Sequence, residues 1–395
     1  MDHIEAIAER SRHPVRVRSG IGGLPADLDL DRFDAIVIHY SLFVADPRHV
    51  PHGMAERIAR SRAAKLLFLH DEHENVLGRR GAIRRLGVGT ILTCMPEREW
   101  PRLYPEAELG PLRLRRVRTG YVSPRLQALN VAPNASRPID IAYRGRVYPS
   151  WHGPLAAERL EIAERAEAAA GRHGWRTDIS VRERDRIYGK AWLEHLARSR
   201  CVLATESGAD RVAFGSGNEP VTEPIAMRQV SPRIFEAAAT RTLIAGFEGE
   251  WSALLEDGET FVAIRRDDHA LDGLAAVLAD QEHVSRIVER AHKNLIASGD
   301  NADRHLAAIL DEEIDLALTG RVRIGEGYAP QEFEQRFGDY RSPWRVHLLK
   351  DRAADVAKRA FAHSTDVLPE AAGARLERMA RRGRTILRRA TPPPR

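Results

Sequence analysis

The stretch that decides the fold is Gln229-Val-Ser-Pro-Arg-Ile-Phe-Glu236-Ala-Ala-Ala-Thr-Arg-Thr-Leu-Ile-Ala-Gly246, which predicts a helix followed at once by a buried strand. Ser231 is a favourable N-cap, and Pro232 takes the first helical position, where its missing N–H is not needed. The free N–H groups and the helix dipole favour phosphate there, and Arg233 adds a cation. One turn further, Glu236 offers a carboxylate to ribose hydroxyls. The segment predicts a nucleoside diphosphate site; the alternative is an ordinary capped helix with solvated charges.

The composition narrows the class of protein. The chain has 395 residues, of which 43% are hydrophobic and 30% charged, enough for two domains with full cores. Its 61 basic and 56 acidic residues leave a net charge of only +5, which does not indicate nucleic acid as a partner. No segment has the length and apolarity of a membrane span or a secretory signal. Cys94 and Cys201 lie in apolar runs and should be buried and reduced, so we expect a cytoplasmic protein.

Short apolar runs alternate with amphipathic stretches, the pattern of βα units with parallel sheets. Strands are expected at 35–39, 65–69, 90–93, 139–143, 177–181, 201–205, 242–245 and 260–264, and the main later helices at 154–171, 267–279, 284–298 and 302–318. We therefore predict an α/β fold of two doubly wound Rossmann-like domains that face a cleft. The polar, proline-bearing segment 129–138 should link them.

The expected domains are residues 1–128, an N-terminal acceptor domain, and residues 137–320, a C-terminal nucleotide-sugar-binding domain. The only strand-like piece before residue 35 is 15–17, so either a first strand is missing or the sheet begins later. Residues 321–395 form a basic tail that we expect to be helical. Such a tail allows peripheral contact with anionic lipid at the inner face of the membrane; the alternative is a solvated face.

Four segments, taken in order, resemble the C-terminal half of a two-Rossmann (GT-B-type) glycosyltransferase, the bacterial glycosyl transferases family 1 type: Asp140-Ile-Ala-Tyr-Arg-Gly-Arg146, Cys201-Val-Leu-Ala-Thr-Glu-Ser-Gly208, Ser231-Pro-Arg-Ile-Phe-Glu-Ala237 and Leu254-Leu-Glu-Asp-Gly-Glu-Thr-Phe-Val262. The resemblance is good over about 140–311 and weak before it. It implies transfer of a sugar from a nucleotide-diphosphate donor to the hydroxyl of a glycan or lipid-linked acceptor, in cell-surface polysaccharide or envelope glycan synthesis.

The resemblance also implies donor-binding residues. Gly145 lies at the first βα turn, where the absence of a side chain lets the backbone approach a phosphate. Arg144 and Arg146 flank it and would balance the diphosphate charge. Ser231 and Arg233 belong to the anion site, and Glu236 matches the carboxylate that holds the donor ribose in such enzymes.

The glutamate pattern of this chain departs from that of the family, in which two glutamates bracket seven residues. Glu206 follows a strand and should lie at the ligand-binding edge of the sheet. An inserted segment, 210–227, separates it from Glu236. Glu219 or Glu223 is therefore an alternative to Glu206.

The acceptor side should come from the N-terminal domain. The run His70-Asp-Glu-His-Glu74 follows the strand 65–69 and should face the cleft. Asp71 or Glu72 would deprotonate the acceptor hydroxyl if burial raises the pKa of the carboxyl group. His39, at the end of the preceding strand, is another candidate base or a donor to the leaving phosphate; the alternative is a structural histidine.

Two segments offer metal ligands by residue type. The run Asp27-Leu-Asp-Leu-Asp31 has the Asp-x-Asp spacing of metal-dependent glycosyltransferases, but it precedes a strand, so we interpret it as a loop. His70, Asp71, His73 and Glu74 are close in sequence, yet such neighbours rarely converge on one ion without a distant ligand. We therefore expect no bound metal and no cofactor besides the donor, with helix N-termini and arginines stabilising the leaving diphosphate. The alternatives are a nucleotide-sugar epimerase on the same fold and a non-catalytic binding module of a polysaccharide-assembly complex.

Overall fold

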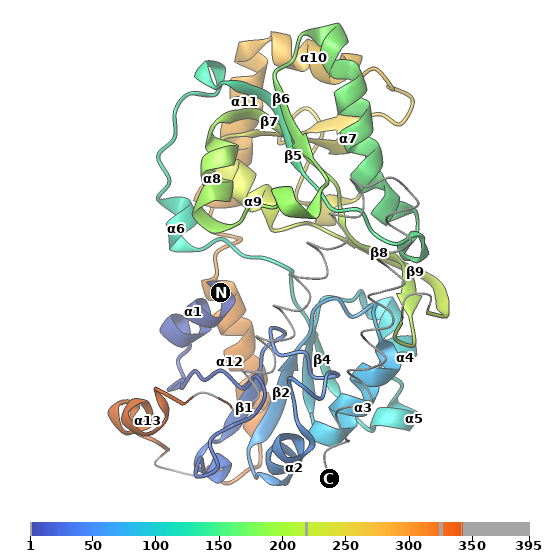
Figure 1. The fold of residues 1–395 in the computed structure, drawn as a ribbon. Helices are drawn as coiled ribbons and strands as arrows, with labels where there is room; N and C mark the ends of the chain where they lie inside the picture. The colour runs from blue at the N-terminus through green and yellow to red at the C-terminus, as the bar shows by residue number, and fades with distance from the viewer. Residues whose placement is uncertain (1, 218–219, 324–326, 341, 343–395) are drawn as a thin grey trace, which may run out of the picture.

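The computed structural model describes residues 2–217, 220–323, 327–340 and 342, which form two α/β domains (Figure 1). The N-terminal domain holds a four-stranded sheet in the order β1-β2-β3-β4, with bounds Ala35–Ile38, Ala64–Phe68, Thr90–Thr93 and Arg113–Arg116. The C-terminal domain holds a five-stranded sheet in the order β11-β10-β7-β5-β6, with bounds Val262–Ile264, Leu243–Phe247, Ser199–Ala204, Ile139–Arg144 and Thr177–Ser180. All pairings in both sheets are parallel. The expected pair of Rossmann-like domains is therefore confirmed.

The N-terminal sheet winds in one direction, because its strands follow one another in sequence order. Right-handed crossovers then place the connecting helices α2 (His52–Arg60) and α3 (Val76–Leu86) on one face. The short helices α4 and α5 follow, with bounds Trp100–Leu103 and Glu106–Leu109. No strand forms at 15–17, and the edge strand β4 was not predicted because its run Arg-Leu-Arg-Arg carries no apolar pattern.

The second face of this sheet is covered by helices from the two ends of the described chain. Helix α12 (Arg304–Leu318) buries Leu306, Leu310 and Ile314 in the N-terminal core, and α1 (Asp2–Arg10) packs against it (Figure 1). The range expected for the C-terminal domain, 137–320, thus includes a helix that packs on the N-terminal sheet. The sequence could not show this placement, because an amphipathic helix does not reveal which sheet buries its apolar face.

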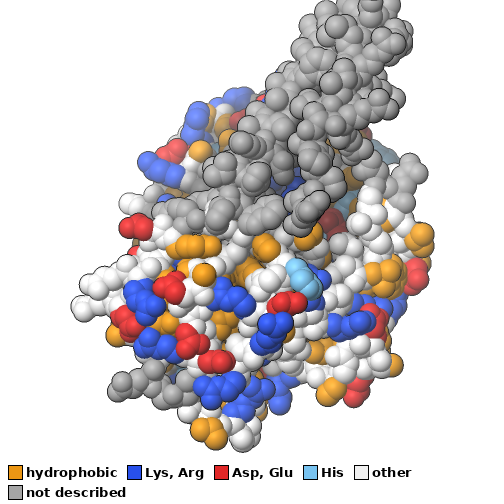
Figure 2. Space-filling view, turned by 60° about the horizontal axis from the view of Figure 1, so that its bottom comes forward, with side chains coloured by type: hydrophobic (Ala, Val, Ile, Leu, Met, Phe, Trp, Pro, Cys, Tyr) orange, Lys and Arg blue, Asp and Glu red, His pale blue; other side chains and the backbone are white. Residues whose placement is uncertain are grey.

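Only the first part of the expected basic tail is described. Helix α13 (Pro330–Phe337) buries Phe333 and Phe337 in the N-terminal core. The strongly basic segment after it lies within residues 343–395, outside the described residues, so peripheral membrane contact stays a prediction. Among the described helices, none has the length and apolarity needed to cross a bilayer. On the uncovered part of the face in Figure 2, basic and acidic side chains are interspersed.

The C-terminal sheet is doubly wound, and its strand order reverses between β5 and β7. One face is covered by α7, α10 and α11, with bounds Pro154–His173, Asp272–Ala279 and Gln281–His292. The other face is covered by α8, α9 and the π-helical turn η7, with bounds Gly189–Ala197, Arg233–Ala239 and Lys293–Ala297. In such sheets the crevice at the carboxyl ends of the strands where the order reverses is the usual ligand site. Cys201 on β7 and Cys94 after β3 are buried and free, as expected.

Two chain segments that cross between the domains run side by side. The backbone N–H of Val122 donates to the carbonyl of Asn301 (2.8 Å), and that of Asp303 donates to the carbonyl of Val122 (2.9 Å). Segment 129–138, which we expected to link the domains, packs on the C-terminal domain. There Arg137 donates to the carbonyls of Ser199 and Thr240. The boundary therefore lies closer to Val122 than to residue 129.

A third connection is the antiparallel hairpin of β8 (Ser207–Ala213) and β9 (Thr222–Gln229), which contains most of the inserted segment. Although it leaves the C-terminal domain, its apolar residues Ala209, Val212, Ile225 and Met227 belong to the N-terminal core. The N–H of Ala213 donates to the carbonyl of His73 (2.7 Å), and the N–H of Leu77 donates to the carbonyl of Phe214 (2.9 Å). The insertion thus ties the two domains together.

Candidate functional site

A cavity of about 190 Å³ lies at the carboxyl edge of the C-terminal sheet, where the strand order reverses. It is enclosed by the loop after β5, the end of β7 and the start of α9. Its apolar lining comes from Val202, Leu203 and Ala204 of β7, Ile244 of β10, and Ile234 and Ala237 of α9. The location is the one that the doubly wound topology favours for a ligand.

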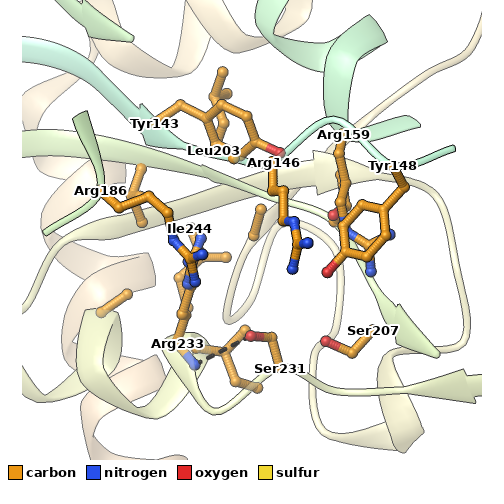
Figure 3. Close-up of a pocket in the computed structure, with 16 residues that line it drawn as sticks. Tyr143, Arg146, Tyr148, Arg159, Arg186, Leu203, Ser207, Ser231, Arg233 and Ile244 are labelled. Carbon is orange, nitrogen blue, oxygen red and sulfur yellow. Dashed lines mark hydrogen bonds between the residues drawn. The ribbon is translucent and has the colours of Figure 1, made fainter. Parts of the chain in front are cut away.

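Four arginines from four separate segments line this cavity: Arg146, Arg159, Arg186 and Arg233 (Figure 3). Within the described chain, none of the 16 lining residues is acidic. The cavity therefore has an excess of positive charge in a partly enclosed place, which suits a multiply charged anion such as a diphosphate.

Aromatic rings and carbonyls hold three of these arginines. The guanidinium carbons of Arg146 and Arg159 lie 5.1 and 4.5 Å from the ring centroid of Tyr148. That of Arg233 lies 5.2 Å from the ring of Trp192, and its Nη1 donates to the carbonyl of Arg144. Cation–π contacts of this kind orient a guanidinium without neutralising it.

Gly145 lies in the turn after β5 and lines the cavity, as predicted. A Cβ at this position would lie 2.5 Å from the ring of Tyr143, so any side chain would displace a buried tyrosine. Burial raises the pKa of Tyr143 to about 12, so its hydroxyl stays protonated at neutral pH. The glycine lets the backbone run close to the ligand space.

The start of α9 also lies where the sequence predicted it, with the helix beginning at Arg233 instead of Pro232. Oγ of Ser231 accepts the N–H of Arg233 at 3.4 Å, the weak cap drawn in Figure 3. Ser231 and Arg233 both line the cavity. Glu236 does not line it: Oε2 of this half-buried residue accepts the indole N–H of Trp192 at 2.7 Å. Its ribose role stays a prediction.

Arg144 does not reach the cavity, contrary to our expectation. Its guanidinium donates to the carbonyls of Tyr143 and Asp178 and pairs with the Asp178 carboxylate at 2.7 Å. It therefore binds to the neighbouring strand β6. Arg144 is the last residue of β5, whereas Arg146 lies in the loop after the strand, so the two side chains are not held to one direction by strand geometry.

Glu206 is also structural rather than ligand-facing. The residue is 4% exposed, its Oε1 accepts the N–H of Trp251 at 2.6 Å, and burial raises the pKa of its carboxyl group. Of the two alternatives, Glu223 pairs with Arg102 of the N-terminal domain at 3.4 Å, and Glu219 lies outside the described residues.

The N-terminus of the long helix α7 is occupied by a carboxylate of the chain itself. Oδ2 of Asp210, on the inserted hairpin, accepts the N–H of Leu155 at 2.5 Å, and Oδ1 of Asp210 pairs with Arg228 at 3.1 Å. This helix end would otherwise attract a phosphate. An anion in the cavity therefore depends on the arginines and the Gly145 turn.

The two candidate bases after β2 have opposite environments. Glu72 is 2% exposed and accepts from Thr93 Oγ1 (2.5 Å), the N–H of Cys94 (2.7 Å) and the hydroxyl of Tyr104. Burial raises the pKa of its carboxyl group, but the three donors hold it inside the N-terminal domain, so the structure does not favour Glu72 as the base. Asp71 is exposed, with a left-handed φ of 50° that turns the chain after the strand.

The surroundings of His39 favour a structural role for this histidine over a role as a base. Its ring packs among those of His3, Tyr40 and Phe68, and its Nδ1 lies 3.0 Å from Oγ of Ser41. Burial, together with His3 and His70, lowers the pKa of His39 to about 4. A group with so low a pKa is a weak base at neutral pH.

The three carboxylates of the run Asp27–Asp31 bind partners within the N-terminal domain. Asp29 caps the short helix Leu30–Arg32, Asp31 accepts the N–H of Arg62, and Asp27 pairs with Arg336.

The sequence did not single out Arg159, Arg186 or Tyr148 as site residues. Arg159 and Arg186 lie among many arginines, and only the fold brings them to one cavity.

Comparisons with known proteins give one family match. Residues 150–311 match the family model described as glycosyl transferase-like. No curated protein sequence matches the chain. This match lies within the segment, about 140–311, over which the sequence resembles the C-terminal half of a GT-B-type glycosyltransferase.

Several solved structures are similar in part. An alpha-glucosyltransferase in complex with UDP-glucose and DNA has 11% identity and a TM-score of 0.47, over 72% of this chain and 80% of that one. Anabaena HepE in complex with UDP has 12% identity and a TM-score of 0.42, over 67% and 77%. TarM has 11% identity and a TM-score of 0.41, over 67% of this chain and 53% of TarM. The match thus spans about half the length of TarM.

Proposed function

We propose that this protein transfers a sugar from a nucleoside diphosphate sugar to an acceptor hydroxyl. The observation that carries the proposal is the cavity at the carboxyl edge of the C-terminal sheet, with four arginines and no acidic side chain among its described lining residues. In sugar transfer the bond from the sugar to the diphosphate breaks, and negative charge grows on the leaving diphosphate. Fixed cations at that place stabilise the transition state more than the ground state.

The donor would bind with its diphosphate between the Gly145 turn and the start of α9. Arg146, Arg159 and Arg233 would neutralise the phosphate oxygens, and Ser231 would donate a further hydrogen bond. Glu236, oriented by the indole of Trp192, would accept from the ribose hydroxyls at the rim. The charge balance supports this arrangement, because the arginines supply what a divalent cation supplies in metal-dependent enzymes.

We further propose that the diphosphate is held without magnesium or manganese. Turnover should persist in excess chelator, and neither metal should stimulate it. A strict requirement for either ion, restored by its addition, would contradict this mechanism.

Asp71 is the acceptor base in this proposal. It follows β2 at the carboxyl edge of the N-terminal sheet, in a loop that also contains His73, whose ring contacts His152 of the C-terminal domain. An exposed carboxylate there can accept the proton of an acceptor hydroxyl, and the acceptor would be a cell-surface glycan or a lipid-linked glycan. Its support is the position of the loop and the family of the C-terminal domain.

A two-stage experiment tests the function. A thermal-shift screen of the full chain against nucleoside diphosphates and their sugars identifies the donor, because a ligand at a hundred times its Kd adds about 2.7 kcal/mol of stability. Consumption of that donor is then followed with and without a mixture of glycan acceptors. Acceptor-dependent consumption supports transfer. Conversion of the donor without acceptor would indicate an epimerase, and binding without turnover would indicate a binding module.

A further inference from the structure

Three potential metal ligands from the two domains converge beside the donor cavity. His73 and Glu74 lie in the loop between β2 and α3, and His152 ends the short helix Ser150–His152 before α7. The three ligand atoms, one per residue, all lie within 4.8 Å of one another. In the sequence the His70–Glu74 run lacks a distant ligand, and the fold supplies one in His152.

Within the described chain, no hydrogen bond joins the three side chains to one another. Oε1 of Glu74 lies 3.9 Å from Nε2 of His73 and 3.9 Å from Nε2 of His152. Both distances exceed that of a hydrogen bond. Both histidines are buried, and Nδ1 of His73 is enclosed without a hydrogen-bond partner among the described residues.

The spacing is close to that required by a small cation. Ligands about 2.1 Å from a tetrahedral ion lie about 3.4 Å apart. Each 3.9 Å separation would have to close by about half an ångström, and a pair at the 4.8 Å limit by about 1.4 Å. Glu74 is half-buried, so its carboxylate has room to move and become the third ligand.

From this geometry we propose that His73, Glu74 and His152 bind one divalent transition-metal ion, which clamps the N-terminal domain to the loop of the donor cavity. Two imidazole nitrogens and one carboxylate are typical ligands of Zn²⁺, whereas Mg²⁺ and Ca²⁺ prefer oxygen ligands. The fourth position would hold water. The clamp is separate from the diphosphate site, and the proposal does not depend on the proposed function.

The clamp would reinforce contacts that already join the domains. The carbonyl of His73 accepts the N–H of Ala213 from the inserted hairpin, so the loop is positioned before any ion binds. His152 is similarly fixed by stacking on Trp151, with ring centroids 3.7 Å apart. A preorganised set loses little conformational entropy on binding. Because the hairpin and Val122 connect the domains as well, loss of the ion should reduce stability without abolishing turnover.

The test measures Zn²⁺ binding to the untagged full chain after chelator treatment and dialysis, without nucleotide. Calorimetry should show one tight Zn²⁺ site per chain, and Zn²⁺ should raise the Tm whereas Mg²⁺ should not. Glu74→Gln, which keeps the shape of the side chain, and His152→Gln should each weaken the site by tenfold or more. Circular dichroism and the Tm of the metal-free variants establish that they fold.

The control is His52→Gln, which removes an exposed histidine paired with Glu56 at 3.0 Å on α2. It should leave Zn²⁺ affinity unchanged. The proposal is overturned if no stoichiometric site is found, if binding survives both Glu74→Gln and His152→Gln, or if His52→Gln weakens it equally. Because no nucleotide is present, any of these results leaves the proposed donor site untouched.

Discussion

Replacing Arg159 with alanine is the sharpest test of the donor cavity. The residue lies in the second turn of α7, where alanine favours the helix at least as well as arginine. Within the described chain its guanidinium makes no ion pair, and it packs 4.5 Å from the Tyr148 ring centroid. The substitution should therefore remove a cation from the cavity with little effect on folding.

The expected loss follows from the charge on the donor. A hydrogen bond between charged groups contributes about 1.5–3 kcal/mol, and each 1.4 kcal/mol changes Kd about tenfold. The cavity is open to solvent, so screening favours the lower part of the range. Arg159→Ala should therefore raise the Kd of the preferred nucleoside diphosphate about tenfold to a hundredfold, and it should affect the nucleoside alone very little.

Calorimetric titration at fixed ionic strength measures this effect, since added salt screens the charges. Arg172→Ala is the matched control, because it removes the same charge from the far end of the same helix, where the Arg172 side chain is 65% exposed. If Arg159→Ala binds every nucleoside diphosphate as tightly as the parent chain, the phosphates do not bind in this cavity. Equal losses in both variants would show only a general effect of net charge.

Three further predictions concern the remaining site residues. Asp71→Asn should lower turnover about a hundredfold with nucleotide affinity nearly unchanged, and unchanged turnover would exclude Asp71 as the base. Glu72→Gln should mainly lower the Tm, because three buried donors lose their carboxylate. Glu236→Ala should weaken nucleoside diphosphate binding by roughly 1–3 kcal/mol in calorimetry, and unchanged affinity would place the ribose elsewhere. The pKa of His39 is about 4 in the folded chain, against an ordinary value of 6.5. Its contribution to the free energy of unfolding, measured with urea, should therefore be full above pH 6.5 and fall as the pH is lowered towards 4. His39→Gln should flatten this dependence, and an identical pH profile in the variant would contradict the prediction.

Much of the C-terminal domain could be predicted from local sequence. The strands around Tyr143, Leu203 and Ile244 are continuous apolar runs, which a parallel sheet buried on both faces requires. Gly145 and Ser231 lie where a strand ends or a helix begins, and such positions in a doubly wound fold converge at one edge. This is why the sequence located the cavity without showing its shape.

Which side chains enter the site was decided only by tertiary structure. Asp71 and Glu72 are adjacent and chemically similar, yet one is exposed and the other accepts three buried hydrogen bonds, because packing against Thr93 and Tyr104 fixes the turn. Arg159 is an ordinary position of an amphipathic helix, and His152 is an isolated histidine far from His73 in the chain. Local sequence determines the preferred backbone conformation and the pattern of burial. It does not show which side chains from distant segments come into contact when the chain folds.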